Sequence, residues 1–187
     1  MKKRMNMLAR AAKRTGSQFR NCEDGNQTIN FVFLFPAIML IFLNTIEVGI
    51  YSIRHVVLER GLDVTVRNIR LNTSTPVSAN DVRRMICQNS LLIPDCDNSV
   101  KVEMRPVDPR NVSGTIVPRE VSCVDRSKEA KPAGDVATGI ENDLMILRVC
   151  ALFDPFFPTT GLGRSMPKVS EGAYALVSTA AFAMEPI

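Results

Sequence analysis

Four cysteines are the residues of this 187-residue sequence whose types and spacing most clearly suggest chemistry. Cys87, Cys96, Cys123 and Cys150 all lie C-terminal to residue 80, whereas the fifth cysteine, Cys22, lies near the N-terminus. Cysteines of this kind form disulfides in an oxidising compartment, bind zinc, or stay as buried free thiols. Zinc is not expected, because no C-x-x-C spacing occurs and the only histidine of the chain lies beside a long apolar segment. Disulfides and free thiols remain, and the compartment decides between them.

Other residue types in the chain offer little chemistry. His55 has no second histidine to assist it, and a catalytic serine or cysteine needs a base within hydrogen-bonding reach. The run Gly161-Leu162-Gly163 lacks the third glycine and the preceding strand of a nucleotide-binding loop. Two carboxylate pairs lack the pattern of a calcium loop and are expected to be solvated turn residues: Asp95 with Asp97, and Glu141 with Asp143. We therefore expect a protein that is not an enzyme, with no catalytic residue, metal, cofactor or small-molecule substrate.

An apolar segment near the N-terminus is the element that organises the chain. Residues 31–43 contain no polar side chain, and the apolar character extends over residues 29–53 if Asn30, Asn44 and Glu47 are tolerated. About 20 apolar residues suffice to cross a bilayer, so a transmembrane helix is predicted over residues 26–53. Pro36 predicts a mild kink in it. Glu47 is costly in lipid unless it reaches the headgroups or a partner, and we expect the headgroup position.

The charges of the N-terminal leader predict the orientation of this helix. Residues 1–25 carry seven of the 23 basic side chains but only two of the 19 acidic ones, so the remainder of the chain has a net charge of −1. No basic stripe survives beyond the leader, which argues against nucleic-acid binding. Basic residues beside a span stay in the cytoplasm, which places the C-terminal part outside it. A cleaved signal peptide is the alternative, but its apolar core would be shorter and an A-x-A-like site would follow.

The same segment carries a specific resemblance. Gly25 is followed by Phe31 six residues later and Pro36 eleven residues later, and the apolar run closes on Ile-Glu-Val-Gly at residues 46–49. This pattern resembles the N-terminal signature of TadE/TadF-like proteins, the minor pilins (pseudopilins) of the tight-adherence, or Flp-type, pilus machinery. The resemblance implies cleavage after Gly25 by a prepilin peptidase, which would make Asn26 the new N-terminus. The family usually has glutamate at the fifth residue after the cut, where this chain has Asn30.

The resemblance also implies a function and a location. It implies a non-catalytic minor pilin that takes part in pilus assembly and surface adhesion, with the inner membrane, the prepilin peptidase, other pilins and secretion-platform subunits as partners. The helix would be a single-pass anchor in the bacterial inner membrane, with a periplasmic head that is incorporated into an extracellular pilus. The chain ends in Met184-Glu185-Pro186, which is similar to the Asn-Glu-Pro ending of the family. The alternative is an uncleaved single-pass protein with a periplasmic scaffold or interaction domain.

The rest of the sequence predicts an amphipathic helix and a small α+β head. Residues 54–72 place their charges on one arc of a helix, and residues 73–187 would form the head. We expect a pilin-like α+β fold, in which the long helix packs on a small antiparallel sheet. The predicted pieces of the head are a short helix over residues 81–89 capped by Ser78 or Asn80, strands over residues 99–107, 115–124, 144–153 and 173–184, and loops over residues 125–141 and 154–167. In an oxidising periplasm three disulfide pairings are possible, and we prefer Cys87–Cys96 with Cys123–Cys150.

Overall fold

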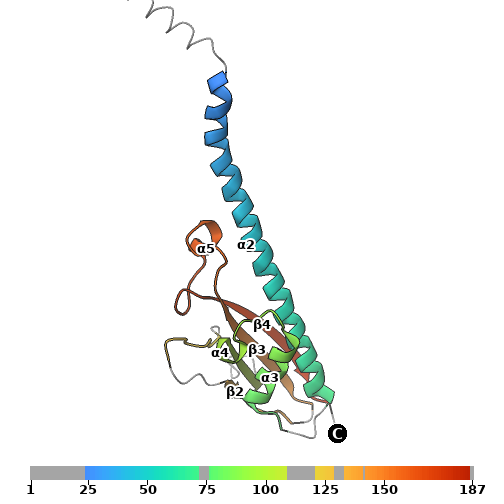
Figure 1. Cartoon of the computed structure of the whole chain (residues 1–187). Helices are drawn as coiled ribbons and strands as arrows, with labels where there is room; N and C mark the ends of the chain where they lie inside the picture. Colours follow the sequence, from blue (N-terminus) through green and yellow to red (C-terminus); the bar gives the residue numbers. More distant parts are fainter. Residues whose placement is uncertain (1–23, 72–75, 109–120, 129–132, 141, 186–187) are drawn as a thin grey trace, which may run out of the picture. The chain divides into compact units, whose positions relative to one another are not determined.

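The computed structural model describes residues 24–71, 76–108, 121–128, 133–140 and 142–185 (Figure 1). These residues belong to two compact units, Met1–Leu43 and Asn44–Ile187, and helix α2 (Asp24–Leu71) contributes to both. The predicted boundary at residue 53 falls inside α2, and the one at residue 72 follows directly after its last residue. The larger unit therefore includes the second half of the helix as well as the predicted head. Most of the leader, with Cys22, lies outside the described part of the chain.

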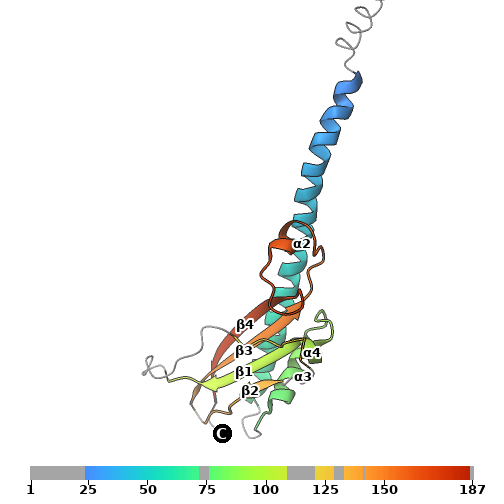
Figure 2. The same ribbon diagram turned by 90° about the vertical axis from the view of Figure 1, so that its left-hand side faces the viewer.

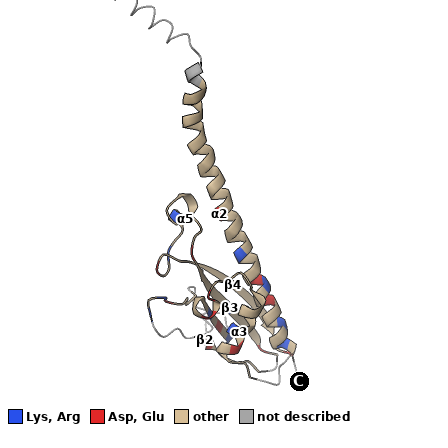
Figure 3. Ribbon diagram, viewed as in Figure 1, with Lys and Arg blue, Asp and Glu red and all other residues tan. Residues whose placement is uncertain are grey.

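The first unit consists, in its described part, of the apolar half of α2. Its side chains from Gln27 to Phe42 are all exposed, and Pro36 lies inside the helix. Among the described residues, one helix is long and apolar enough to cross a membrane: Gln27–Leu71, with a mean hydropathy of 2.2 in its most apolar window. From Gln27 onward, the charged residues of α2 lie in its second half (Figure 3). By length and composition, the chain is thus consistent with membrane anchoring.

The second unit is built on a four-stranded sheet with the order β2-β1-β3-β4 (Figure 2). The strands are β1 (Val100–Pro106), β2 (Gly134–Val136), β3 (Leu144–Phe153) and β4 (Tyr174–Ala183). β3 pairs antiparallel with both β1 and β4, whereas β2 pairs parallel with β1. The expected antiparallel sheet is therefore wrong in this detail, and the sheet is mixed. The α+β class of the prediction is confirmed.

One face of the sheet holds the main core. Alternate residues of β3 point to this face, as the period of a strand requires. They pack against the second half of α2 and against α3 (Ala79–Asn89). The largest buried side chains of this core come from α2, α3 and the three long strands: Leu58, Leu62, Ile86, Met104, Met145, Leu147, Phe153 and Leu176. The amphipathic half of α2 thus serves as the helix layer of the head.

Helix α3 begins where its sequence signal indicates. The side chain of Ser78 accepts a hydrogen bond from the backbone N–H of Asp81, and the Asp81 carboxylate accepts one from the N–H of Ser78. This reciprocal capping box satisfies donors that the first turn of a helix leaves free. Of the two predicted caps, Ser78 is the one used. The short helix α4 (Cys96–Ser99) then leads directly into β1.

Two predicted loops contain regular structure, and one predicted strand is not seen. β2 lies within residues 125–141, and α5 (Gly161–Ser165) lies within residues 154–167. The predicted strand over residues 115–124 falls mostly outside the described residues, and its described part, 121–124, is not a strand. Residues 121–124 instead pass over the second face of the sheet, where Val124 packs against Leu152 and Ala173.

Candidate functional site

The most distinctive local structure of the larger unit is the segment between β3 and β4. Residues 154–173, which include α5, fold back onto the first turns of α2 within this unit. Two side chains of α2, Asn44 and Glu47, hold this segment. Because they are three residues apart on a helix, they point to the same side. We call residues 154–167 the clasp, and Asn44 and Glu47 are the α2 side chains that bind it.

Glu47 makes the central contacts between α2 and the clasp. Its side chain is buried, with 2% relative exposure. The backbone N–H of Phe156 donates to Glu47 Oε1 at 3.0 Å, and the N–H of Phe157 donates to Oε2 at 2.9 Å. A carboxylate that accepts two N–H bonds offsets part of the cost of its burial. Glu47 therefore has a partner within its own chain, and its expected position at the lipid headgroups stays a prediction.

Asn44 binds the next part of the same segment. Its Oδ1 accepts a hydrogen bond from the N–H of Leu162 at 2.6 Å. Gly161, with φ of +49°, lies so close to Asn44 that a Cβ there would overlap the Asn44 side chain. A Cβ on Gly163 would likewise overlap the backbone oxygen of Phe157. Gly161 therefore serves close packing and a left-handed turn, and Gly163 serves close packing.

A second set of polar contacts ties the base of the segment to α2. Arg54 Nη1 donates to the backbone oxygen of Asp154 and to the hydroxyl of Tyr174, both at 2.8 Å, and its guanidinium lies 5.1 Å from the centre of the Phe153 ring. Burial raises the pKa of Tyr174 above its usual value, although the hydrogen bond from Arg54 acts in the opposite direction. Arg126 adds an ion pair to the Asp154 carboxylate at 2.8 Å. The segment is therefore fixed to α2 at both of its ends.

The exposed surface of the clasp is mixed: Phe156, Pro158 and Pro167 are apolar, whereas Thr159, Thr160, Arg164 and Ser165 are polar. Phe156 is 59% exposed and meets Phe157 edge to face, with 4.9 Å between ring centres. A groove of about 570 Å³ lies between the segment and α2. The residues that line this groove are mostly apolar: Val48, Tyr51, Leu162, Met166, Pro167, Val169, Tyr174 and Ala175. Such a surface suits an apolar partner better than a polar substrate.

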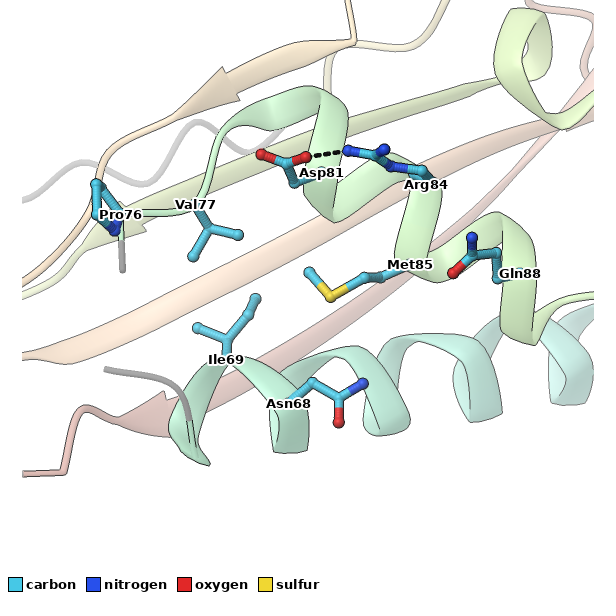
Figure 4. A pocket seen from close by; sticks show the side chains of 8 residues that line it. All are labelled: Asn68, Ile69, Pro76, Val77, Asp81, Arg84, Met85 and Gln88. Carbon is cyan, nitrogen blue, oxygen red and sulfur yellow. Dashed lines mark hydrogen bonds and ion pairs between the residues drawn. The ribbon is translucent and has the colours of Figure 1, made fainter. Parts of the chain in front are cut away.

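A second hollow of about 490 Å³ lies between the last turns of α2 and α3 (Figure 4). Its charged lining residues already have partners, since Arg84 pairs with Asp81 and Asp81 belongs to the capping box. Hydrogen bonds from the side chain and backbone of Ser78 are the main cause that lowers the pKa of Asp81. Met85, Ile69 and Val77 supply apolar walls. No nucleophile and base face each other among the residues that line this hollow.

The two cysteine pairs are those preferred from the sequence. Cys87 is bonded to Cys96, with 5.8 Å between the Cα atoms, and links α3 to the start of α4. Cys123 is bonded to Cys150, with 5.3 Å between the Cα atoms, and ties the chain that covers the second face to β3. Neither disulfide touches the clasp. Both therefore have a structural role in the sheet and its flanking helix.

The other candidate residues lie apart from one another. Gly25 and Asn26 belong to α2, and Asn30, Phe31 and Pro36 are exposed residues of its apolar half. His55 stacks near Tyr51 and lies 3.5 Å from the Glu59 carboxylate on the same helix. Within the described ranges, no group of three or more His, Cys, Asp or Glu side chains is placed to hold a metal ion.

The clasp itself was missed by reasoning from the sequence. Its signal was present in two separate places, as polar residues three apart in an apolar helix and as a Gly-x-Gly run in a distant loop. Nothing in the sequence pairs these two features.

Comparison of the chain with protein-family models, with curated proteins and with solved structures gives no significant match.

Proposed function

We propose that this chain is a membrane-anchored, non-catalytic minor pilin of the tight-adherence type. In this proposal the peptidase removes residues 1–25, the apolar half of α2 holds the protein in the inner membrane, and the head takes part in pilus assembly and adhesion. The observation that carries the proposal is α2 itself, which joins an exposed apolar half to a second half that forms the helix layer of a small sheet. The pattern from Gly25 to residue 49 lies on this one helix.

Three further features support the proposal. The basic leader precedes the apolar helix, as the cytoplasmic flank of an anchor does. Two disulfides stabilise the sheet unit, which is typical of proteins from an oxidising compartment. Finally, the clasp and the groove offer apolar surface rather than an arrangement of acid, base and nucleophile. An interaction or assembly role fits these features better than catalysis.

A second candidate function has one observation in its favour. The residue five positions after Gly25 is Asn30, and the TadE-like pattern usually has glutamate there. An uncleaved single-pass protein, with its head as a scaffold in another envelope complex, would have no need of that glutamate. Asparagine still offers a donor and an acceptor for contacts between helices in lipid.

Intact-mass measurement of the protein from cells with and without a prepilin peptidase distinguishes the two candidates. We expect a product that begins at Asn26 only when the peptidase is present. A Gly25→Leu variant should remain full-length, whereas the control Gly49→Ala should be cleaved normally, because Gly49 lies beyond the cleavage region and has open space around it. Full-length wild-type protein in both backgrounds would contradict the first proposal and favour the second.

A further inference from the structure

The clasp lies beside a part of α2 that the sequence assigns to the membrane. Residues 44–47 follow directly on the apolar run, and the predicted span continues to residue 53. At 1.5 Å per residue, Glu47 and Asn44 lie roughly 9 to 14 Å before the end of that span. If lipid covers α2 to residue 53, a segment bound to Asn44 and Glu47 must share the same layer.

The charges of α2 fit this placement. Between residues 26 and 53 the only charged side chain is Glu47, and it is buried by the clasp. Most exposed side chains up to residue 56 are apolar, with Val48 at 49%, Ile53 at 56% and Val56 at 61% exposure. The hydroxyl of Ser52, which is also exposed, donates to the backbone oxygen of Val48 at 2.8 Å. The clasp adds the apolar Phe156 to this surface, next to exposed polar residues such as Thr159 and Thr160.

The backbone of the clasp is prepared for an environment poor in water. Irregular backbone is tolerated at membrane depth only where its polar groups have partners within the protein. The N–H groups of Phe156, Phe157 and Leu162 are bound by the side chains of Glu47 and Asn44. Three backbone oxygens accept hydrogen bonds from side chains: Asp154 O from Arg54, Leu162 O from the Ser165 hydroxyl, and Gly163 O from Lys168 Nζ at 2.6 Å.

The side chains of the clasp match the headgroup layer of a bilayer. Tyrosine is enriched at the membrane interface, and Tyr51 is exposed and lines the groove. Phenylalanine is common on the apolar face of interfacial segments, and Phe156 is exposed on the clasp. Arg164, at the end of α5, is exposed and can reach lipid phosphates while its aliphatic part stays in the apolar layer. Apolar surface with a basic side chain at its edge is the pattern of interfacial membrane contact.

We propose that the clasp is a second membrane contact of this protein, in which Phe156 and the apolar groove insert into the outer headgroup layer of the bilayer that holds α2. This inference rests on the membrane anchoring contained in the proposed function. The contact would fix the head close to the membrane surface, because α2 and the clasp would enter the same leaflet. Glu47 would act as the positioning residue that holds the clasp at this depth.

Tryptophan fluorescence in the full-length chain tests the inference, since the protein contains no tryptophan of its own. Phe156→Trp would be reconstituted in phosphatidylcholine–phosphatidylglycerol vesicles that carry bromine atoms near the headgroup end of the acyl chains, and Phe42→Trp in vesicles that carry them deeper in the chains. Phe42→Trp reports on the anchor, and Leu71→Trp, at the far end of α2, reports on a site outside the membrane. We expect bromine quenching and blue-shifted emission for Phe156→Trp and Phe42→Trp, and neither change for Leu71→Trp.

The outcomes separate this inference from the anchor on which it rests. Quenching of Phe42→Trp without quenching of Phe156→Trp would overturn the membrane contact of the clasp and leave the anchor intact, as would be found if another subunit covered the groove. Absence of quenching at Phe42→Trp would overturn the anchor itself. Adding Glu47→Ala to Phe156→Trp should reduce the quenching, whereas adding Glu59→Ala, an exposed glutamate of the same helix, should not.

Discussion

Glu47 provides the sharpest test of the clasp, because its carboxylate alone binds two backbone N–H groups. Hydrogen bonds to a charged group contribute about 1.5–3 kcal/mol each. Both bonds here are only partly buried, so the lower value applies to each. Glu47→Ala should then destabilise the closed clasp by about 3 kcal/mol. Glu47→Gln keeps one acceptor but turns an amide N–H₂ towards the other donor, and should cost about 1.5–2 kcal/mol.

Amide hydrogen exchange of the full-length protein in detergent micelles measures this cost directly. Protection at Phe156 and Phe157 reports the free energy of local opening. Since 1.4 kcal/mol corresponds to a factor of ten, Glu47→Ala should reduce protection at these two amides roughly hundredfold. Protection in β3, which lies in the main core, should change far less.

Glu59→Ala is the matched control for this experiment. Glu59 belongs to the same helix, its side chain is 52% exposed, and its one ionic neighbour is His55. Its removal should change stability by less than about 0.5 kcal/mol. Unchanged protection of Phe156 and Phe157 in Glu47→Ala would refute the assignment of Glu47 as the residue that holds the clasp. Equal losses in both variants would point to a general effect on α2.

Three further predictions concern the packing, the disulfides and the titration of the head. Gly161→Ala and Gly163→Ala should each lower the thermal midpoint of unfolding, because their added Cβ atoms overlap Asn44 and Phe157, while Gly49→Ala should not lower it, as nothing lies within 4 Å of Gly49. Replacing Cys123 and Cys150 with alanine should cost about 3.5 kcal/mol in urea unfolding, against about 2.7 kcal/mol for Cys87 and Cys96, because the first pair closes the longer loop; the reverse order would contradict this entropic reasoning. Burial raises the pKa of Tyr174 above 10.0, so the folded chain keeps this proton to higher pH than the unfolded chain. The contribution of this raised pKa to the free energy of unfolding is fully present below pH 10 and is lost above it. Tyr174→Phe should therefore flatten the loss of stability measured above pH 10.

Regular elements with local signals were predictable from the sequence. The Ser78 cap, the helix that follows it and the two long strands β3 and β4 each carry their own periodicity or capping pattern. β1 lies within the predicted strand over residues 99–107. In these cases the physical cause of the structure lies within about ten neighbouring residues, so the sequence shows it.

Elements that depend on distant partners were not predictable. β2 has three residues in a polar stretch and forms only because β1 offers a parallel edge to Gly134 and its neighbours. Glu47 is an ionisable residue in an apolar run, and its burial depends on a segment more than 100 residues away. The position of Glu47 in the apolar run indicates only that its carboxylate needs a partner. The identity of that partner depends on the tertiary fold.

The clasp also explains how one helix serves two surroundings. Up to Phe42 the described side chains of α2 are exposed, whereas at Glu47 the helix is covered by its own chain. The change occurs where Asn44 and Glu47 interrupt the apolar run, since these are the residues that bind the clasp. The α2 residues shown to bind the clasp, Asn44, Glu47 and Arg54, lie C-terminal to Leu43, so the proposed cleavage after Gly25 would remove none of them. The proposed cleavage signal and the residues that bind the clasp therefore lie at opposite ends of the apolar half of α2.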